Sequence, residues 1–235
     1  MKRQICSILL FIFCVTLQAQ LVTYPEGLKA NMPHNDDYTV RVRIPGGEWE
    51  DLFEYNVQVD MDAVQNASMV QFDMNGTVEV MVKKNNGTVR EVDIRPLSCN
   101  IQYRQNKNVI TFMLDKPQYL SVEFNGDRLH NLHLFANPLE TEVYKKAEKG
   151  IMYFGPGVHA PLDLPNNLIR VPGNTTVYLA PGAVLKAKLL VDGVENVRII
   201  GRGILAHPVR GIEVTNAKNV LIDGITVVNP NHYTV

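Results

Sequence analysis

Cysteine, net charge and helical periodicity are all scarce in this sequence, and each shortage excludes a class of protein. The 235 residues include three cysteines, of which Cys6 and Cys14 lie in the first twenty positions. If that segment is removed, Cys99 is left alone, so a disulfide framework is excluded and stability has to come from packing. A formal net charge of -1 gives no electrostatic footprint for nucleic acid or for an anionic membrane.

Short catalytic motifs are missing as well. The sequence contains no nucleophile elbow, phosphate-binding loop, dinucleotide fingerprint or cluster of metal ligands, so we expect no metal and no cofactor. His130 and His133 point to opposite faces if they lie on a strand, which argues against a shared metal site. The acidic residues that resemble acid and base pairs are better explained by turns or solvated faces: Asp36, Asp37, Asp60, Asp62, Asp192 and Asp223.

The N-terminal segment predicts secretion. Lys2 and Arg3 precede an apolar run from Ile5 to Val15, and a small-residue exit follows from Leu17 to Ala19. This pattern is typical of a secretory signal peptide, here residues 1–19. A membrane anchor is the alternative, but the run is shorter than the roughly 20 residues that a spanning helix needs. We therefore expect a secreted or periplasmic protein with no membrane insertion after cleavage.

Residues 20–145 read as short strands separated by turns. Tyr38 to Ile44 alternates apolar and charged residues, which suits a strand with one buried face. Asn75-Gly76 and Asn86-Gly87 each stand between alternating segments and predict hairpins, because both residue types tolerate positive φ. Many such strands with almost no helical periodicity predict an antiparallel β-sandwich. Further strands are expected at Val109 to Leu114, Tyr119 to Phe124 and Asn131 to Phe135.

Residues 146–235 change character, because Gly and Asn recur at a long period. When Asp192–Gly201 is set over Thr215–Gly224, Asn196 falls on Asn219 at an offset of 23 residues. Such a period points to a solenoid, in which each coil rests on the previous one. The short Val- and Ile-rich segments favour a parallel β-helix over a leucine-rich repeat or another β architecture. They are Val177–Leu179, Leu189–Val191, Val197–Ile200, Ile212–Val214 and Val220–Ile222.

Two further details follow from this alignment. The stacked Asn196 and Asn219 should hydrogen-bond to each other at a turn, and Glu195 over Lys218 should add a surface ion pair of little energetic value. Thr141–Gly150, the one charged and helix-compatible stretch, is expected to connect the sandwich to the β-helix.

Several segments together resemble a known family, the secreted β-helical polysaccharide hydrolases. The chain is most similar to the dextranase-like enzymes of glycoside hydrolase family 49 and, in its coils, to the polygalacturonases of family 28. The resemblance extends from about Tyr24 to the end, and the coil motifs alone identify only the β-helix. The matching segments are "YLSVEFNGDRLHNLHLFANPLE" from Tyr119, "IMYFGPGVH" from Ile151, "TTVYLAPGAVLKA" from Thr175, "NVRIIGRGIL" from Asn196 and "NVLIDGITVVNP" from Asn219.

The resemblance implies an all-β fold, with an N-terminal antiparallel β-sandwich followed by the first coils of a right-handed parallel β-helix. It also implies hydrolysis of O-glycosidic bonds in a dextran-like or pectin-like polysaccharide, with inversion. In such a reaction one carboxylic acid protonates the leaving oxygen, while a second carboxylate activates a water on the opposite face of the sugar.

The candidate site residues come from the end of the sequence. In the family, the catalytic aspartates follow the "VVNP" type of segment, whereas five residues follow Pro230 here and no residue matches a catalytic motif. We therefore expect a truncated, N-terminal part of a longer enzyme, inactive alone. Asn229, His232 and Tyr233 fall where the family chain approaches its substrate, and Tyr233 is a candidate stacking ring, although ordinary coil packing would also explain all three.

Two alternatives of other classes remain open at this stage. A non-catalytic carbohydrate-binding or adhesion protein could use the same sandwich and coils. A polysaccharide lyase could share the β-helix, but it usually needs an acidic calcium-binding cluster and a basic residue that acts as the base, and neither is visible in the sequence.

Overall fold

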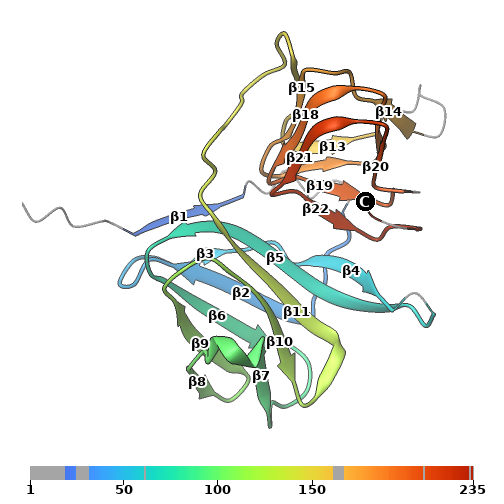
Figure 1. The fold of residues 1–235 in the computed structure, drawn as a ribbon. Helices are drawn as coiled ribbons and strands as arrows, with labels where there is room; N and C mark the ends of the chain where they lie inside the picture. The colour runs from blue at the N-terminus through green and yellow to red at the C-terminus, as the bar shows by residue number, and fades with distance from the viewer. Residues whose placement is uncertain are drawn as a thin grey trace, which may run out of the picture.

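The chain folds into two stacked sheets followed by a set of parallel sheets (Figure 1). The computed structural model describes residues 19–24, 32–60, 62–160, 167–208, 210–232 and 234. The predicted signal peptide lies outside these residues, apart from Ala19. In the described part, helical structure is limited to the short 3-10 turn η1 (Leu97–Cys99) and Asn167, so the predicted all-β class is confirmed. No helix there is long and apolar enough to cross a membrane.

The first sheet has the strand order β1-β5-β11-β10-β7. β4 also pairs with β5, on the side of β5 that faces away from β11. Its pairs are antiparallel except for β5 and β11, which run parallel. The parallel pair places the two longest strands side by side in the middle of the sheet. The bounds are β1 (Gln20–Thr23), β4 (Tyr55–Val59), β5 (Gln65–Asn75), β7 (Val92–Arg95), β10 (Gln118–Phe124) and β11 (Asp127–Pro138).

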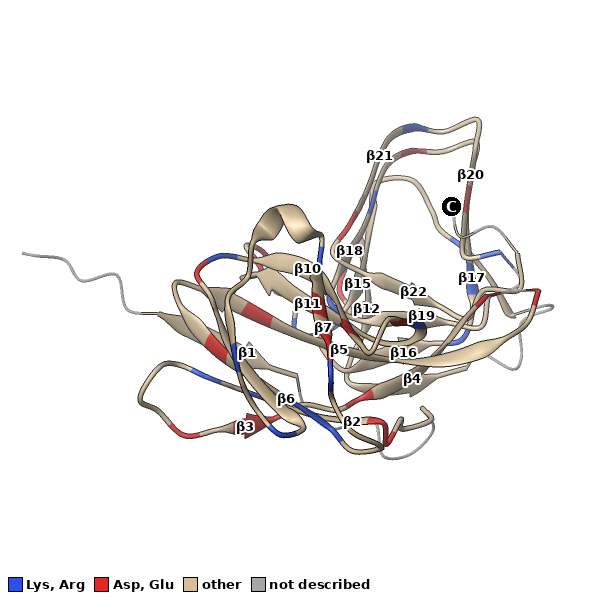
Figure 2. Ribbon diagram, turned by 90° about the horizontal axis from the view of Figure 1, so that it is seen from below, with Lys and Arg blue, Asp and Glu red and all other residues tan. Residues whose placement is uncertain are grey.

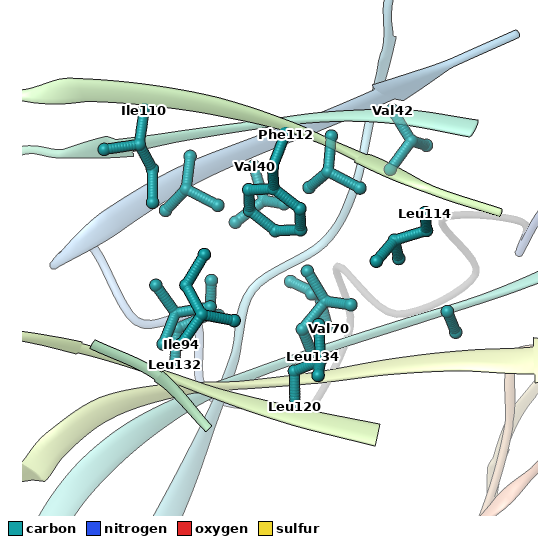
Figure 3. Packing of buried hydrophobic residues seen from close by; sticks show 14 of the residues in the cluster. Val40, Val42, Val70, Ile94, Ile110, Phe112, Leu114, Leu120, Leu132 and Leu134 are labelled. Carbon is teal, nitrogen blue, oxygen red and sulfur yellow. The ribbon is translucent and has the colours of Figure 1, made fainter. Parts of the chain in front are cut away.

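The second sheet is fully antiparallel, with the order β3-β2-β6-β9-β8. Strands such as β2, β6 and β7 bury alternate residues between the two sheets, as the period of two in the sequence predicts. Figure 3 shows Val40 and Phe112 of one sheet facing Val70 and Leu134 of the other. The bounds are β2 (Tyr38–Arg43), β3 (Glu50–Asp51), β6 (Val78–Lys84), β8 (Tyr103–Asn106) and β9 (Val109–Leu114).

The two predicted Asn-Gly hairpins are wrong, although both turns exist. Asn75-Gly76 joins β5 to β6, and these strands belong to different sheets. Asn86-Gly87 likewise precedes β7, which pairs with β10 and not with β6. Each turn therefore carries the chain across the sandwich. A third such dipeptide, Asn125-Gly126, does close a two-residue hairpin, because Phe124 pairs with Asp127.

The remaining strands form three parallel sheets, and the β-helix is confirmed. Strands of successive coils pair in register, for example Val177 with Ile199 and Ile199 with Ile222. One sheet contains β12 (Ile151–Phe154), β15 (Thr175–Leu179), β18 (Glu195–Gly201) and β21 (Lys218–Asp223). A second contains β13 (Gly157–His159), β16 (Ala183–Leu185), β19 (Ile204–Ala206) and β22 (Thr226–Val228). The third contains β14 (Leu168–Arg170), β17 (Lys188–Asp192) and β20 (Ile212–Thr215).

A ladder of asparagines marks one corner of the coils. Asn196 Nδ2 donates to Asn174 Oδ1 at 2.9 Å, and Asn219 Nδ2 donates to Asn196 Oδ1 at 2.7 Å. All three residues have positive φ, which asparagine tolerates better than most side chains. The predicted stacking of Asn196 and Asn219 is confirmed, and the ladder reaches one coil further back.

The connection between the two parts is extended, not helical. Thr141–Gly150 contains turns and an isolated bridge, so the helix-compatible composition of this stretch is overridden by tertiary contacts. Tyr144 packs edge-on against Tyr178 of β15, and Glu142 accepts two hydrogen bonds from Arg198 of β18 at 2.7 and 2.8 Å. These contacts hold the connection against the outer face of the first parallel sheet.

Candidate functional site

The chemically richest region of the chain is the junction between the sandwich and the β-helix. Val184, Ile204 and Val228, from three successive coils, pack against Val57 and Met69 of the first sheet. The outer face of β5 is therefore buried almost along its whole length. This apolar interface fixes the β-helix on the sandwich.

A buried ion pair crosses the same junction. Arg202 Nε lies 2.9 Å from Asp73 Oδ1, with side-chain exposures of 7% and 4%. Arg202 also donates to the carbonyl oxygens of Pro138 at 2.7 Å and Gly201 at 3.1 Å. The Tyr24 hydroxyl donates to Asp73 at 2.5 Å, and burial, reinforced by this carboxylate, raises the Tyr24 pKa. The sequence offered no sign of this pair, because its members are 129 residues apart.

Glu140 lies beside this network. The Tyr178 hydroxyl donates to both of its carboxylate oxygens, at 3.0 and 3.1 Å. Burial raises the pKa of Glu140, while the hydrogen bond from Tyr178 and the charge of Arg202 oppose the rise. A carboxyl with a raised pKa has the property of a general acid. However, its partners are structural groups of the junction, so we assign it to the interface.

The acidic side chains on the coils mostly have partners in the adjacent coil. Glu213 forms an ion pair with Lys188, and Glu195 pairs with Lys218 at 3.0 Å, as the alignment predicted. Asp192 Oδ1 accepts a hydrogen bond from Thr215 at 2.6 Å. These ion pairs and this hydrogen bond join one coil to the next. Inversion requires a different arrangement, in which two carboxylates face the same sugar.

The three predicted substrate-binding residues have different surroundings. Asn229 is buried at the end of β22, where its Oδ1 accepts a hydrogen bond from the backbone N–H of Gln58 at 2.7 Å. This contact ties the last described coil to β4. His232 is exposed in the bend that follows. Tyr233 lies outside the described residues, so its role stays a prediction.

Two grooves flank β22 where it crosses the first sheet. One, of about 280 Å³, lies between Tyr119, Phe135 and the segment from Gly224 to Val227, which includes the start of β22. The other, of about 200 Å³, lies between β4, β11 and the segment Thr226–Pro230. Tyr119 is 60% exposed and meets Phe135 edge-on, with ring centroids 5.6 Å apart. Two aromatic rings of the first sheet therefore line the groove beside β22.

The other residues singled out in the sequence have structural surroundings. Asp60 accepts hydrogen bonds from the backbone of Asp62 at 3.1 Å, which makes a turn. His130 bonds Asp127, and His133 is half-buried on β11. Cys99 packs against the sandwich core. Among the described residues, no group of three or more His, Cys, Asp or Glu is placed to hold a metal ion.

Sequence reasoning missed a histidine held between two carboxylates. His34 Nδ1 lies 2.8 Å from Asp36 Oδ1, and His34 Nε2 lies 3.1 Å from Glu54 Oε2. Glu54 is buried, and its other oxygen accepts the backbone N–H of Val40 at 2.6 Å. The stretch "PHNDDY" was visible as a loop, but its partner Glu54 is 20 residues away from His34.

Charges of both signs are spread over the sandwich and the β-helix (Figure 2). This distribution agrees with the near-zero net charge of the sequence. It favours recognition by hydrogen bonds and packing over long-range attraction of a charged partner.

Comparison with known proteins identifies the fold. No family model and no curated protein matches the chain by sequence. Among solved structures, Dex49A from Penicillium minioluteum superimposes with a TM-score of 0.66 at 19% sequence identity. The match covers 87% of this chain and 56% of Dex49A, so the chain spans little more than half of that protein. At this identity the likeness shows a shared fold, which over 87% of this chain includes both the sandwich and the parallel sheets.

Proposed function

We propose that the chain is the polysaccharide-recognising scaffold of an inverting glycoside hydrolase that acts on a dextran-like or pectin-like polymer. The observation that carries this proposal is the architecture shared with Dex49A, a sandwich docked on the flank of a parallel β-helix, over 87% of the chain. The sequence resemblance to the dextranase-like enzymes of family 49 supports the same conclusion.

The 235 residues alone should not hydrolyse a glycosidic bond. Inversion needs two carboxyl groups about 6.5–9.5 Å apart, with room for a water and a sugar between them. In the described coils, Glu195 and Glu213 are in ion pairs, and Asp192 holds Thr215. We therefore propose that the described coils bind the polymer.

Asn229, His232 and Tyr233 are the proposed contacts with the polymer. Asn229 anchors the segment through Gln58, and His232 is exposed immediately after it. A tyrosine ring that stacks on a sugar supplies apolar contact while its hydroxyl stays hydrated. Secretion, predicted from residues 1–19, would place the protein where such polymers occur.

Native gels cast with dextran or polygalacturonate test the proposal. Retardation by one of the two polymers is expected, weaker for Tyr233→Ala and unchanged for Tyr103→Ala, which removes an exposed ring of the sandwich. Migration unaffected by either polymer would refute the proposal. Release of reducing ends in a parallel assay would show that the chain carries its own acid and base.

A non-catalytic binding or adhesion protein is the second candidate. The pairing of coil carboxylates with Lys188, Lys218 and Thr215 favours this candidate, because a binding protein needs no catalytic acid or base. The two candidates separate when the coding sequence beyond the codon for Val235 is translated. Further coils with clustered aspartates would support the hydrolase.

A further inference from the structure

Three Asn-Gly dipeptides occur in the sequence, and each lies at or near the end of a strand. They begin at Asn75, Asn86 and Asn125. Asparagine is among the thermolabile residues, and a following glycine has no Cβ to keep its backbone nitrogen away from the asparagine side chain. Attack of that nitrogen on Cγ closes a succinimide ring. The reaction requires an asparagine side chain that is free to turn toward the nitrogen, so the three positions differ in their reactivity.

Asn125 is held most firmly. Its Oδ1 accepts the backbone N–H of Arg90 at 2.8 Å and that of Glu91 at 3.3 Å, and its Nδ2 donates to the Thr88 carbonyl oxygen at 2.8 Å. These hydrogen bonds fix the side-chain amide on the loop before β7. Cγ of Asn125 cannot reach the nitrogen of Gly126 until they break, which slows the reaction.

Asn86 is held by one hydrogen bond. Its Nδ2 donates to Asp37 Oδ1 at 3.1 Å, and Asp37 immediately precedes β2. Asn86 and Gly87 are both exposed. The side chain of Asn86 is therefore restrained, but by fewer contacts than that of Asn125.

Asn75 has no such restraint. In the part of the chain that the structure describes, its side chain makes no hydrogen bond or ion pair. Asn75, Gly76 and Thr77 are all exposed, so water reaches the dipeptide. Pairing of β5 with β11 stops at Met74, and Asn75 itself pairs with β1, the four-residue strand at the edge of the sheet. Both the side chain and the backbone of Asn75 can therefore adjust to ring closure.

We propose that Asn75 is a site of spontaneous modification, at which the folded chain converts asparagine to aspartate and isoaspartate. The Gly76 nitrogen gives up its proton and bonds to Cγ of Asn75. The bond from Cγ to the side-chain nitrogen breaks, and that nitrogen leaves with the proton as ammonia. Water, the one co-reactant, then adds to either carbonyl carbon of the succinimide and opens the ring. The product carries a new negative charge and, as isoaspartate, an extra main-chain atom at the end of β5.

Peptide mapping by mass spectrometry tests the proposal on the full chain, incubated in mildly alkaline buffer and sampled over several weeks. The peptide that contains Asn75 should lose its amide first, and its product should include isoaspartate, detected with a protein isoaspartate methyltransferase. Asn125 should react at least about tenfold more slowly, because its hydrogen bonds must break first. Asn75→Gln should abolish the early product, since the longer side chain cannot close the same ring.

Two controls separate the effect of structure from that of local sequence. In urea the three dipeptides should react at similar rates, because the hydrogen bonds of Asn86 and Asn125 are lost. Asp37→Ala should speed the reaction at Asn86 and leave Asn75 unchanged, and an unchanged rate at Asn86 would contradict the protection on which the proposal rests. The proposal is overturned if Asn75 keeps its amide throughout, if Asn86 or Asn125 reacts first in the folded chain, or if the order of reaction persists in urea.

Discussion

Removing the buried cation at the junction should destabilise the protein strongly. In Arg202→Met the side chain keeps much of its length and loses its charge, so Asp73 stays buried with Tyr24 as its remaining donor. The carbonyl oxygens of Pro138 and Gly201 also lose hydrogen bonds. The effect should appear in global stability, because these contacts join the two parts of the chain.

The expected magnitude follows from burial. Breaking a buried ion pair by removing one partner costs about 3–5 kcal/mol, since the charge left behind is uncompensated. Arg41 and Asp51 form a geometrically similar pair on the surface, with Nε to Oδ1 at 2.5 Å and side-chain exposures of 43% and 61%. An exposed pair contributes about 0.2–1 kcal/mol, so Arg41→Met is the matched control.

Urea unfolding followed by circular dichroism measures both variants. The double variant Asp73→Leu, Arg202→Met should lose less stability than the sum of its two single variants, because it leaves no isolated charge. The interaction energy should lie within about 0.5–3 kcal/mol. If Arg202→Met loses less than 1 kcal/mol of stability, no more than Arg41→Met, the claim that the Asp73–Arg202 pair stabilises the junction is refuted.

Three further predictions concern the ladder, the coil corner and the sandwich. Asn196→Ala removes two ladder hydrogen bonds and should cost about 1–3 kcal/mol in urea unfolding, roughly twice the cost of Asn219→Ala; equal costs would contradict the ladder. Gly201→Ala sets a methyl against the backbone of Leu179 at positive φ, so its melting temperature should fall further than that of Gly87→Ala, whose methyl meets nothing within 4 Å; similar losses would contradict the close approach. Burial raises the pKa of Glu54 above 4.5, so the contribution of Glu54 to stability is complete below that pH and is lost as the pH rises through the folded-state pKa. The stability of Glu54→Gln, measured by urea unfolding, should therefore rise relative to that of the wild type between pH 4 and pH 8. A difference in stability that stays constant with pH would contradict this.

The repeat could be predicted from the sequence because stacking depends on local alignment. The 23-residue offset placed Asn196 on Asn219, and the structure confirms both the hydrogen bond and the neighbouring pair of Glu195 with Lys218. A solenoid repeats one short unit, so position in the unit determines position in space.

Strand pairing in the sandwich could not be predicted in the same way. Asn75-Gly76 allows the chain to change direction, but it does not decide whether the next strand pairs with β5 or crosses to the other sheet. The choice is made by partners distant in the sequence, such as β11, which lies parallel to β5. Alternation identified the buried faces correctly, but it does not specify the neighbour.

The candidate site was the least predictable part. Asn229 was singled out by the resemblance to the family, and the structure gives it a backbone partner, Gln58, 171 residues away. The pair of Asp73 with Arg202 and the bracketing of His34 by Glu54 likewise depend on tertiary contacts that leave no spacing in the sequence. Such networks become visible only when the two parts are packed together.

Affinity electrophoresis of the purified chain tests the central claim most directly, with dextran and polygalacturonate each cast into native gels over a series of concentrations. The account predicts that mobility falls with the concentration of one polymer while no reducing ends are released. Mobility that stays constant with both polymers would contradict the claim that this scaffold recognises a polysaccharide.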